Sequence, residues 1–492
     1  MAEKKAFYLT TTLPYVNADP HIGFALEMVQ ADIVARYHAL MGDEVFFNTG
    51  TDEHGLKIHR KALEHKIAPQ QYVDEYAAKF RELTKTLDLY PDLHFIRTTD
   101  PHHKAAAQEF WKLCFANGDI YKKDYTISYC VGCELEKTAS ELVDGKCPLH
   151  PNLDIEHIHE ENYFFRWSKY QQRLLDFYSQ HPDFVLPDFR FNEIRKFVEH
   201  GLEDFSISRL KEKMPWGIEV PGDPAHVMYV WFDALINYIS TLGWPEDTAN
   251  VEKFWGTKEH PNGIQFAGKD QIRQQAAMWQ AMLMSAGLPN TKQILIHGFI
   301  TSGGQKMSKS LGNVINPTAI IDEYGVDPLR YFLARHIHPF EDSDFTMENF
   351  KEVYNANLAN GLGNLVARVM KLAEDNLDSG TRPASPEHQR GEPEAAGFPS
   401  EYTEALEKFE INKAADYIWQ RIGALDERIT REEPFKLIKT DKEAGKKLIL
   451  EMTQELYLIA RMLSPFMPGT NAKIKQAVID NKKPSNLFAR KD

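Results

Sequence analysis

The chain has 492 residues, which predicts several domains, and its 43% hydrophobic and 26% charged residues are typical of a globular protein. No apolar run approaches the roughly 18 residues of a membrane span, and the N-terminus lacks the apolar segment of a signal peptide, so we expect a cytoplasmic protein. The net charge of −14 excludes a protein that is basic throughout, but it is compatible with a local basic surface for RNA. Only four cysteines occur, which argues against a disulfide framework.

The first residues predict a β–α–β unit. Residues 6–13 are rich in β-branched and aromatic side chains and predict a strand, and residues 14–20 predict a turn. A helix follows, with apolar residues three or four positions apart, and Gly42 ends it. A second strand at 45–49 completes the unit, which is typical of a parallel nucleotide-binding sheet. Residues 56–116 are predicted to be largely helical.

His21 and Gly23 lie in the first turn of the predicted helix. A helix N-terminus favours anions, glycine lets a phosphate approach the backbone, and an imidazole can donate to a phosphate oxygen. A lone His-x-Gly pair is also common in an ordinary capping turn. The interpretation as a phosphate site therefore depends on the β–α–β context and on a second motif downstream.

Cys130, Cys133, Cys147 and His150 form the pattern C-x2-C-x13-C-x2-H. Thiolates and a neutral imidazole at this spacing predict a closed, tetrahedral zinc site. A closed site with four protein ligands indicates a structural role, not a chemical one. The alternative is a set of free cysteines in a hydrophobic core.

The second motif is a glycine-rich basic loop, in which Gly303-Gly304 precede Lys306-Met307-Ser308-Lys309-Ser310. Glycines let the backbone approach a ligand closely, and lysines supply compact positive charge for phosphate oxygens. An arbitrary pair of lysines around a serine would more often form a solvated turn. A predicted strand at 292–296 leads into this loop.

The pattern from residue 350 onward is helical. Asn364 and Arg368 are four residues apart and share a helix face, where an amide and a guanidinium can read the edge of an unpaired base. Taken alone, such a pair is more often part of a solvated face. Residues 380–399 are rich in Pro and Gly and predict a mobile loop between two helices of one bundle.

These motifs resemble those of a known family. The stretch from Lys306 to Ser310 matches KMSKS, the second signature of class I aminoacyl-tRNA synthetases, without a change. The stretch from His21 to Phe24 is similar to the first signature, HIGH, with Phe24 in place of the last His. Leu-Pro-Tyr-Val-Asn at 13–17 and Gly-Thr-Asp-Glu-His-Gly at 50–55 narrow the resemblance to methionyl-tRNA synthetases.

The resemblance implies an α/β fold: a Rossmann-like parallel sheet split by a zinc-bearing connective insertion and followed by an all-α anticodon-binding bundle. The two halves of the catalytic domain are expected at 1–116 and 227–315, with the insertion at 117–226. A stem-contact region is expected at 316–350 and the helical anticodon-binding domain at 351–492.

The resemblance also implies a two-step reaction. The methionine carboxylate attacks the α-phosphate of ATP, giving methionyl-adenylate and pyrophosphate, and a ribose hydroxyl of the tRNA then takes the methionyl group and releases AMP. The expected partners are ATP, methionine and a methionine-accepting tRNA, and the expected metals are one structural zinc and magnesium with ATP. A monomer is expected, since the sequence does not continue into the dimerising RNA-binding domain of some relatives.

Residue roles follow from the resemblance, position by position. The catalytic residues it implies are His21, Lys306 and Lys309. The ATP-binding residues it implies are Gly23, Glu27, Gly268, Asp270, Lys306 and Lys309. The methionine-binding residues it implies are Leu13, Tyr15, Asp52, Trp231, Tyr238 and Gln275. The anticodon-binding residues it implies are Asn364, Arg368 and Phe435. Gln275 and Phe435 depart from the family pattern, where His and Trp are usual.

Other protein classes remain open at this point. A small-molecule adenylyltransferase uses a similar His-x-Gly-His turn, but the zinc insertion and the helical bundle argue against it. A catalytically weak tRNA-binding relative would explain Phe24 and Gln275, but the complete KMSKS stretch and Asp52 argue against it. Leucyl-, isoleucyl- and valyl-tRNA synthetases share both signatures, but usually carry a large editing insertion for which no stretch here is long enough.

Overall fold

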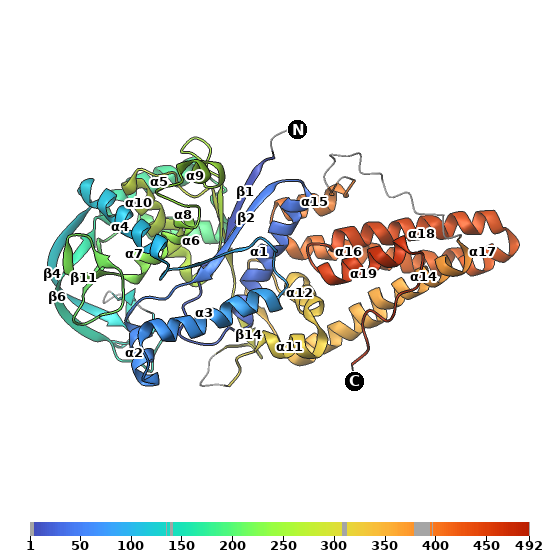
Figure 1. The fold of residues 1–492 in the computed structure, drawn as a ribbon, viewed down its shortest axis with the longest axis horizontal. Helices are drawn as coiled ribbons and strands as arrows, with labels where there is room; N and C mark the ends of the chain where they lie inside the picture. The colour runs from blue at the N-terminus through green and yellow to red at the C-terminus, as the bar shows by residue number, and fades with distance from the viewer. Residues whose placement is uncertain are drawn as a thin grey trace.

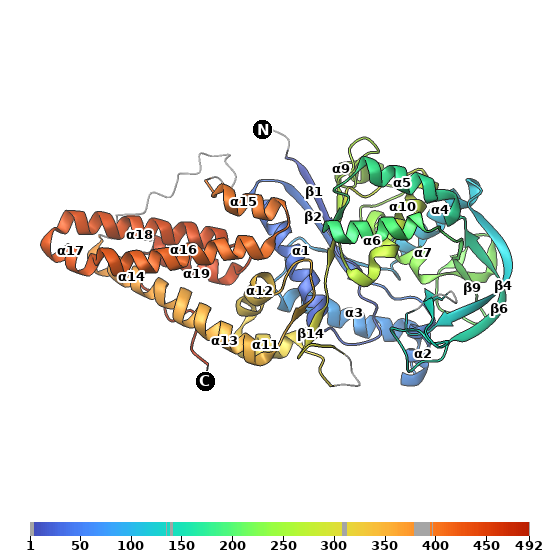
Figure 2. The ribbon, with the colours of Figure 1, turned by 180° about the vertical axis from the view of Figure 1, so that it is seen from behind.

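The protein is elongated, with an α/β body at one end and a helical bundle at the other (Figures 1 and 2). The structure is a computed structural model that describes residues 4–133, 135–137, 141–307, 312–377, 394–395 and 397–491. Within these residues, no helix combines the length and the apolar character that crossing a membrane requires.

Six parallel strands form the central sheet of the body, in the order β3-β2-β1-β12-β13-β7. Their bounds are β1 Ala6–Thr10, β2 Glu44–Thr51, β3 His94–Arg97, β7 Val185–Leu186, β12 Gly263–Gly268 and β13 Gln293–His297. From β1 the chain winds outward through β2 to β3, and from β12 it winds in the other direction to β13; the earlier segment β7 forms that edge. The space beyond the carboxyl ends of β1 and β12 is therefore the switch point where such sheets bind ligands.

Four helices lie in the first part of the chain. Helix α1 (Ile22–Leu40) follows β1, helices α2 (Leu56–His65) and α3 (Pro69–Thr86) follow β2, and helix α4 (Pro101–Ala116) follows β3. Helix α1 is buried along almost its whole length, between the sheet and the helices that follow the loop motif. The β–α–β prediction for residues 6–49 is confirmed. The largely helical prediction for 56–116 missed β3, a four-residue edge strand that carries no clear alternation of apolar and polar residues.

The segment expected as an insertion is built around a long antiparallel hairpin of β4 (Ile120–Cys130) and β6 (Glu156–Phe165). Shorter elements complete it: β5 Leu135–Glu136, α5 Gln171–Gln180, α6 Asp188–Glu199, β8 Phe205–Ser206, β9 Ser208–Leu210, β10 Glu219–Val220 and β11 Asp223–Met228. The same segment also supplies β7, which pairs in parallel with β13. It therefore extends the catalytic sheet by one edge strand, in addition to carrying the cysteine cluster.

The chain then returns to the sheet. The elements on either side of β12 are α7 Val230–Ala234, α8 Asn237–Ser240, α9 Thr248–Phe254, the 3-10 turn η3 Lys269–Gln271, the π-helical turn η4 Gln274–Met278 and α10 Trp279–Ala286. After β13, a small sheet is formed by β14 Ile300–Ser302, β15 Gln305–Lys306 and β16 Ser343–Asp344. This small sheet holds the described part of the loop motif.

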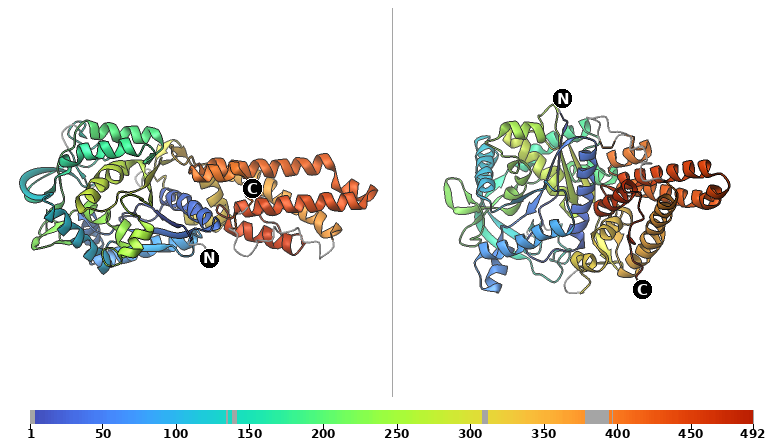
Figure 3. Two further views of the ribbon diagram at one scale, coloured as in Figure 1. Left: turned by 90° about the horizontal axis from the view of Figure 1, so that it is seen from above. Right: turned by 45° about the vertical axis from the view of Figure 1, so that its right-hand side comes forward.

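After the small sheet begins, the described chain is mostly helical. The helical prediction from residue 350 onward is confirmed, and these later helices project away from the central sheet (Figure 3). The helices that follow β15 are α11 Pro317–Tyr324, α12 Val326–Arg335, α13 Met347–Val353, the π-helical η6 Tyr354–Gly363, α14 Asn364–Asn376, α15 Ser400–Glu407, α16 Ile411–Glu432, α17 Pro434–Thr440, α18 Lys442–Leu463 and α19 Pro468–Ile479. The loop predicted at 380–399 lies almost wholly outside the described residues.

A buried arginine helps to join the body to the bundle. Arg330 on α12 is fully buried, and its Nη2 donates to Asp32 Oδ2 on α1 at 2.6 Å. The same guanidinium donates to the carbonyls of Leu87 at 3.1 Å, Pro465 at 2.8 Å and Phe466 at 3.0 Å. Because a buried charge is stable only when it is paired and hydrogen-bonded, these contacts hold the first helix of the body and the end of α18 in one arrangement.

Candidate active site

The first turn of α1 is arranged around His21, which caps the helix. The Nδ1 atom of His21 accepts a hydrogen bond from the Gly23 N–H at 3.1 Å, so in the neutral imidazole the proton lies on Nε2, which can donate to a ligand. A Cβ atom at position 23 would lie 2.9 Å from His21 Cε1, so only glycine fits beside this ring. Phe24 stacks on the His21 ring with centroids 4.3 Å apart and thereby fixes its orientation.

The two signature-like stretches lie in contact. The backbone N–H of Ile22 donates to the carbonyl of Ile315, just after the loop motif, at 3.0 Å. Lys306 is described and lies on β15, in register with Thr301 of β14. Lys309 lies outside the described residues, together with Ser308 and Ser310. The structure thus brings the His21 turn and the base of the lysine loop to the same edge of the sheet.

Glu27 and His297 form a buried pair at the end of β13. Glu27 Oε2 lies 2.7 Å from His297 Nε2, while Glu27 Oε1 accepts from both the N–H and the hydroxyl of Thr12 at 2.7 Å. His297 Nδ1 lies 2.8 Å from the carbonyl of Gly298, so both ring nitrogens face acceptors. Burial favours the neutral ring, but the hydrogen bond and charge of Glu27 outweigh it and raise the pKa of His297.

Gly268 and Asp270 complete this polar cluster at the end of β12. A Cβ atom at position 268 would lie 2.9 Å from Asp270 Oδ1 and 3.6 Å from His297 Cε1, so the missing side chain keeps the space between them open. Burial raises the pKa of Asp270, and the positive charges of His297 and Lys306 oppose that rise. The predicted residues Glu27, Gly268, Asp270 and Lys306 therefore surround one site at the switch point.

A second group of predicted residues lies beyond β1 and β2. Tyr15 and Asp52 form a parallel bridge, in which the Asp52 N–H donates to the carbonyl of Pro14 at 2.9 Å and the Val16 N–H donates to that of Asp52 at 3.2 Å. Asp52 is 5% exposed, and Leu13 is half-buried just before the bridge. This arrangement places a carboxylate beside an aromatic ring at the edge of the sheet.

Trp231 joins the same group through a small aromatic cluster. Trp231 and Tyr15 both pack against the cluster formed by Tyr129, Tyr229 and Val230. Trp231 lies on α7, which follows the connective segment, so the insertion brings this wall of the site to the first half of the sheet.

Gln275 and Tyr238 form the other buried wall. Gln275 Oε1 accepts from Gln265 Nε2 at 3.3 Å, and Gln265 Oε1 accepts from the Thr291 hydroxyl at 2.6 Å. This chain of hydrogen bonds orients the buried Gln275 amide. Burial raises the pKa of the Tyr238 hydroxyl, and the nearby Gln275 side chain opposes that rise. Gln275 lies in the π-helical turn η4, a local widening that is frequent at functional sites.

The predicted anticodon residues lie in the bundle. Asn364 begins α14, and Arg368 is exposed on the same face, where its guanidinium pairs with the carboxylate of Asp426 on α16. Phe435 is 45% exposed on α17, at the far end of the bundle (Figure 1). All three side chains are therefore accessible to a large ligand.

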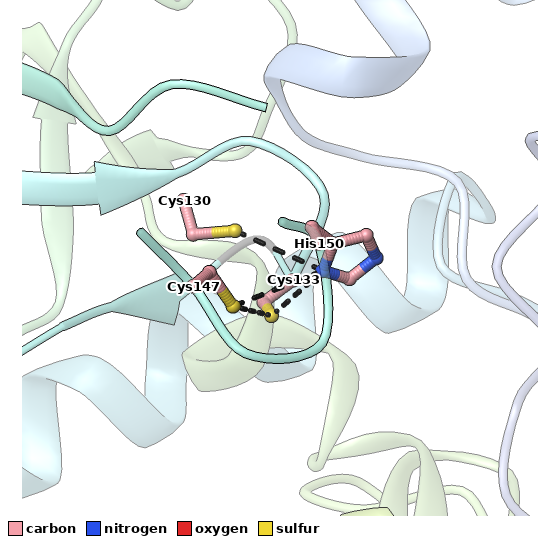
Figure 4. Close-up of side chains that lie close together, drawn as sticks. All are labelled: Cys130, Cys133, Cys147 and His150. Atoms are coloured by element: carbon pink, nitrogen blue, oxygen red, sulfur yellow. Dashed lines mark hydrogen bonds between the residues drawn. The ribbon is translucent and has the colours of Figure 1, made fainter. Parts of the chain in front are cut away.

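The four predicted metal ligands converge at the tip of the β4–β6 hairpin (Figure 4). Cys133 Sγ lies 3.4 Å from Cys147 Sγ and 3.2 Å from His150 Nδ1, and Cys130 Sγ lies 3.8 Å from the same nitrogen. A tetrahedral ion with Zn–S and Zn–N bonds of about 2.3 and 2.1 Å would separate its ligands by roughly 3.4–3.8 Å. The geometry therefore fits a four-coordinate metal ion, and a Cβ at Gly132 would lie 2.4 Å from the His150 ring.

Three residues that shape the site were not predicted from the sequence, namely Thr12, His297 and Asp344. His297 is the last residue of β13, and the rule that ligands bind beyond the carboxyl ends of parallel strands would have indicated it. Asp344 Oδ1 accepts from the Thr301 hydroxyl at 2.6 Å and from the Gly304 N–H at 2.8 Å, which fixes the turn that leads to Lys306. No local signal distinguishes Asp344, because its partners are about forty residues away.

The switch-point site, the lysine loop and the hairpin insertion together define a class I aminoacyl-tRNA synthetase. The family described as tRNA synthetases class I (M) matches residues 7–157 and 136–370. The chain is 42% identical to the methionine–tRNA ligase of Thermosynechococcus vestitus, covering 95% of this chain and 89% of the relative. It is 40% identical to that of Thermotoga maritima, covering 97% and 76%.

Solved structures agree. Methionyl-tRNA synthetase from Mycobacterium tuberculosis in complex with methionyl-adenylate is 33% identical, with a TM-score of 0.88 and coverage of 99% of this chain and 100% of that one. The chain belongs to the methionyl-tRNA synthetase family of ATP-dependent ligases. This membership sets aside the small-molecule adenylyltransferases and the leucyl-, isoleucyl- and valyl-tRNA synthetases.

Proposed function

We propose that this chain activates methionine with ATP and transfers it to a methionine-accepting tRNA, and that the residues named above perform these steps. The observation that carries the proposal is the hydrogen bond between Ile22 and Ile315, because it joins the helix that begins at His21 to the base of the lysine loop. Phosphate-binding groups from both stretches then face one space beyond β1 and β12.

Methionine would occupy the space between the two walls described above. Asp52 would hold its ammonium group through a charge-assisted hydrogen bond. Leu13, Tyr15 and Trp231 would line its apolar side chain, and the oriented amide of Gln275 beside Tyr238 would meet the thioether. The carboxylate would then point toward the α-phosphate of ATP.

ATP would lie across the switch point. Gly23 and Gly268 would let the nucleotide approach the backbone, while Glu27 and Asp270 would bind the ribose. His21 would donate from Nε2 to phosphate, and Lys306 and Lys309 would stabilise the charge that develops as pyrophosphate leaves. Magnesium is expected to arrive with ATP and to neutralise part of its phosphate charge.

Two further sites would support these steps. Asn364 and Arg368 would read an anticodon base by its polar edge, and Phe435 would stack on a base. Zinc is the proposed ion of the Cys130–His150 site, because three thiolates and one imidazole in tetrahedral arrangement suit it, and its role would be structural. The monomeric state stays a prediction, which light scattering would check. The cytoplasmic location also stays a prediction, which cell fractionation would check.

Pyrophosphate exchange tests the proposal directly. With each standard amino acid in turn, only methionine should support rapid exchange, and only methionine tRNA should then be charged. Lys309→Ala should reduce exchange by about 10²–10³, the size of one lost contact to developing charge, with little change in methionine binding. Exchange without charging would indicate another adenylating enzyme, and RNA binding without exchange would indicate a catalytically weak relative.

A further inference from the structure

A pocket lies beside the predicted anticodon face and is closed on one side by the C-terminal tail. Its volume is about 160 Å³. One side is formed by Asn360 and Gly363 of η6 and by Asn364 of α14, and the other by Asn486, Phe488 and Arg490 of the C-terminal tail, which is the segment after α19. Asn364 is also one of the two residues already proposed to read the anticodon, and Arg368 lies one turn further along the same face. The pocket and that face are therefore continuous.

The tail is fixed to the helix by specific hydrogen bonds and does not merely rest on it. The Tyr354 hydroxyl donates to the carbonyl of Ala489 at 2.8 Å. Asn355 pairs twice with Lys491, since its Nδ2 donates to the Lys491 carbonyl at 2.7 Å and its Oδ1 accepts from the Lys491 N–H at 2.9 Å. Figure 1 shows the tail running from α19 past the long helix that contains α14.

Small side chains and aromatic packing keep the pocket open. Phe488 packs edge-to-face on Tyr354 with centroids 6.2 Å apart. A Cβ atom at Gly363 would lie 3.1 Å from the Leu358 carbonyl oxygen and in ordinary contact, at 3.6 Å, with the Phe488 ring, so glycine suits this position and leaves the space beside the ring open. The ring and the backbone of η6 therefore form a preorganised wall.

The polar groups of the pocket are available to a ligand. Asn360, Asn364, Asn486 and Arg490 are exposed, and within the described part of the chain no internal hydrogen bond or ion pair uses their side chains. Three amides carry both donors and acceptors, a guanidinium carries only donors and a fixed positive charge, and Phe488 supplies an aromatic surface. This is the combination that binds single-stranded nucleotides: amides for base edges, an aromatic ring for a base face and arginine for phosphate.

We propose that this pocket binds one unpaired nucleotide of the tRNA anticodon loop, next to the base that Asn364 and Arg368 read, with Arg490 on its phosphate and Asn486 on its base edge. The inference depends on the proposed function, because it assigns the tail to the same RNA contact. It adds the C-terminal tail to the residues that recognise tRNA.

The test uses the full chain with an anticodon stem-loop RNA and with whole methionine tRNA. Arg490→Ala should weaken stem-loop binding about tenfold and lower the slope of log K against log salt by about one, as expected for one lost phosphate contact. Charging should show a similar rise in KM for tRNA, whereas pyrophosphate exchange should be unchanged. Lys483→Ala is the matched control, because it removes one positive charge from the same tail outside the pocket and should leave binding near that of the parent.

Single abasic replacements along the loop would locate the bound nucleotide. At one loop position, removing the base should weaken binding to the parent protein. The same abasic RNA and the intact loop should bind the Asn486→Ala variant equally well, because that variant has already lost the contact to the base. Equal binding by Arg490→Ala and the parent, or an equal loss in Lys483→Ala, would overturn the inference. Failure of the parent itself to charge tRNA would instead overturn the proposed function.

Discussion

The carboxylate of Glu27 and the imidazole of His297 lie 2.7 Å apart in the interior, joining α1 to the end of β13. His297→Gln keeps a donor but cannot carry the charge, so Glu27 would lose its charged partner. We expect the KM for ATP in pyrophosphate exchange to rise about tenfold, equivalent to about 1.4 kcal/mol, with the KM for methionine little changed. An equal rise in both constants would place the pair outside the ATP site.

The same pair should make stability depend on pH. Burial disfavours the charged ring, but Glu27 raises the pKa of His297 above 6.5 in the folded protein. The pair's contribution is therefore complete below about pH 6.5 and is lost as the pH rises through the folded-state pKa. The difference in Tm between the parent and His297→Gln should be largest at acidic pH and should decrease as the pH rises. A Tm difference that does not change with pH would contradict this account.

Asp344, which lies outside the lysine loop in the sequence, should hold that loop in position. Its exposed carboxylate accepts two hydrogen bonds, from the Thr301 hydroxyl and the Gly304 N–H, and such bonds contribute about 0.5–1.5 kcal/mol each. Asp344→Ala should slow exchange at least about tenfold at saturating substrates, because the hairpin that carries Lys306 loosens. Glu341→Ala, an exposed neighbour, should exchange at the parent's rate, and a parental rate in Asp344→Ala would remove the carboxylate from this role.

Gln275 should govern methionine binding. Gln275→Leu removes the buried amide beside Tyr238 and leaves the Gln265 Nε2 donor without that acceptor, which costs about 1–3 kcal/mol. We expect kcat/KM for methionine to fall about tenfold while the KM for ATP stays constant. Gln275→His, which restores the residue usual in the family, should retain exchange. Unaltered methionine kinetics in Gln275→Leu would show that the amide does not face the substrate.

Arg368 should matter for charging alone. Arg368→Ala would remove the proposed contact to an anticodon base and should slow charging of methionine tRNA about 10- to 100-fold. Pyrophosphate exchange should be unchanged, because the proposed adenylate site lies in the α/β body. Asp426→Ala is the matched control, since it frees the guanidinium from its ion pair and should leave charging intact or faster. Parallel losses of exchange and charging in Arg368→Ala would indicate a folding defect.

The metal site should stabilise the hairpin. Purified protein should contain about one zinc per chain, and a chelator or Cys133→Ser should lower the Tm of the connective segment, because metal binding contributes folding free energy. Protein without metal, whose melting a chelator does not change, would disprove the site.

Local patterns predicted the first β–α–β unit, the cysteine cluster and the helical bundle well, because each depends on spacing within a short stretch. They could not predict the partner of Glu27, since His297 comes from a strand 270 residues away that only the folded sheet brings close. The edge strand β7 was missed for a similar reason: two residues carry no periodicity, and β13 determines their pairing. The roles of Leu13, Asp52 and Phe435 came from family resemblance, and the structure supplies their surroundings.

Arg330 has a mechanical consequence. Its guanidinium spans α1, the turn at Leu87 and the loop at Pro465, and a shared hydrophobic core continues between the same elements. The proposed reaction centre and the proposed anticodon-binding end of the bundle are therefore held at a fixed separation. If the bundle reads the anticodon as proposed, a tRNA whose anticodon stem is longer by one base pair would present its acceptor end and its anticodon at the wrong separation and relative orientation. Selection would then act on RNA dimensions as well as on bases, without any added contact.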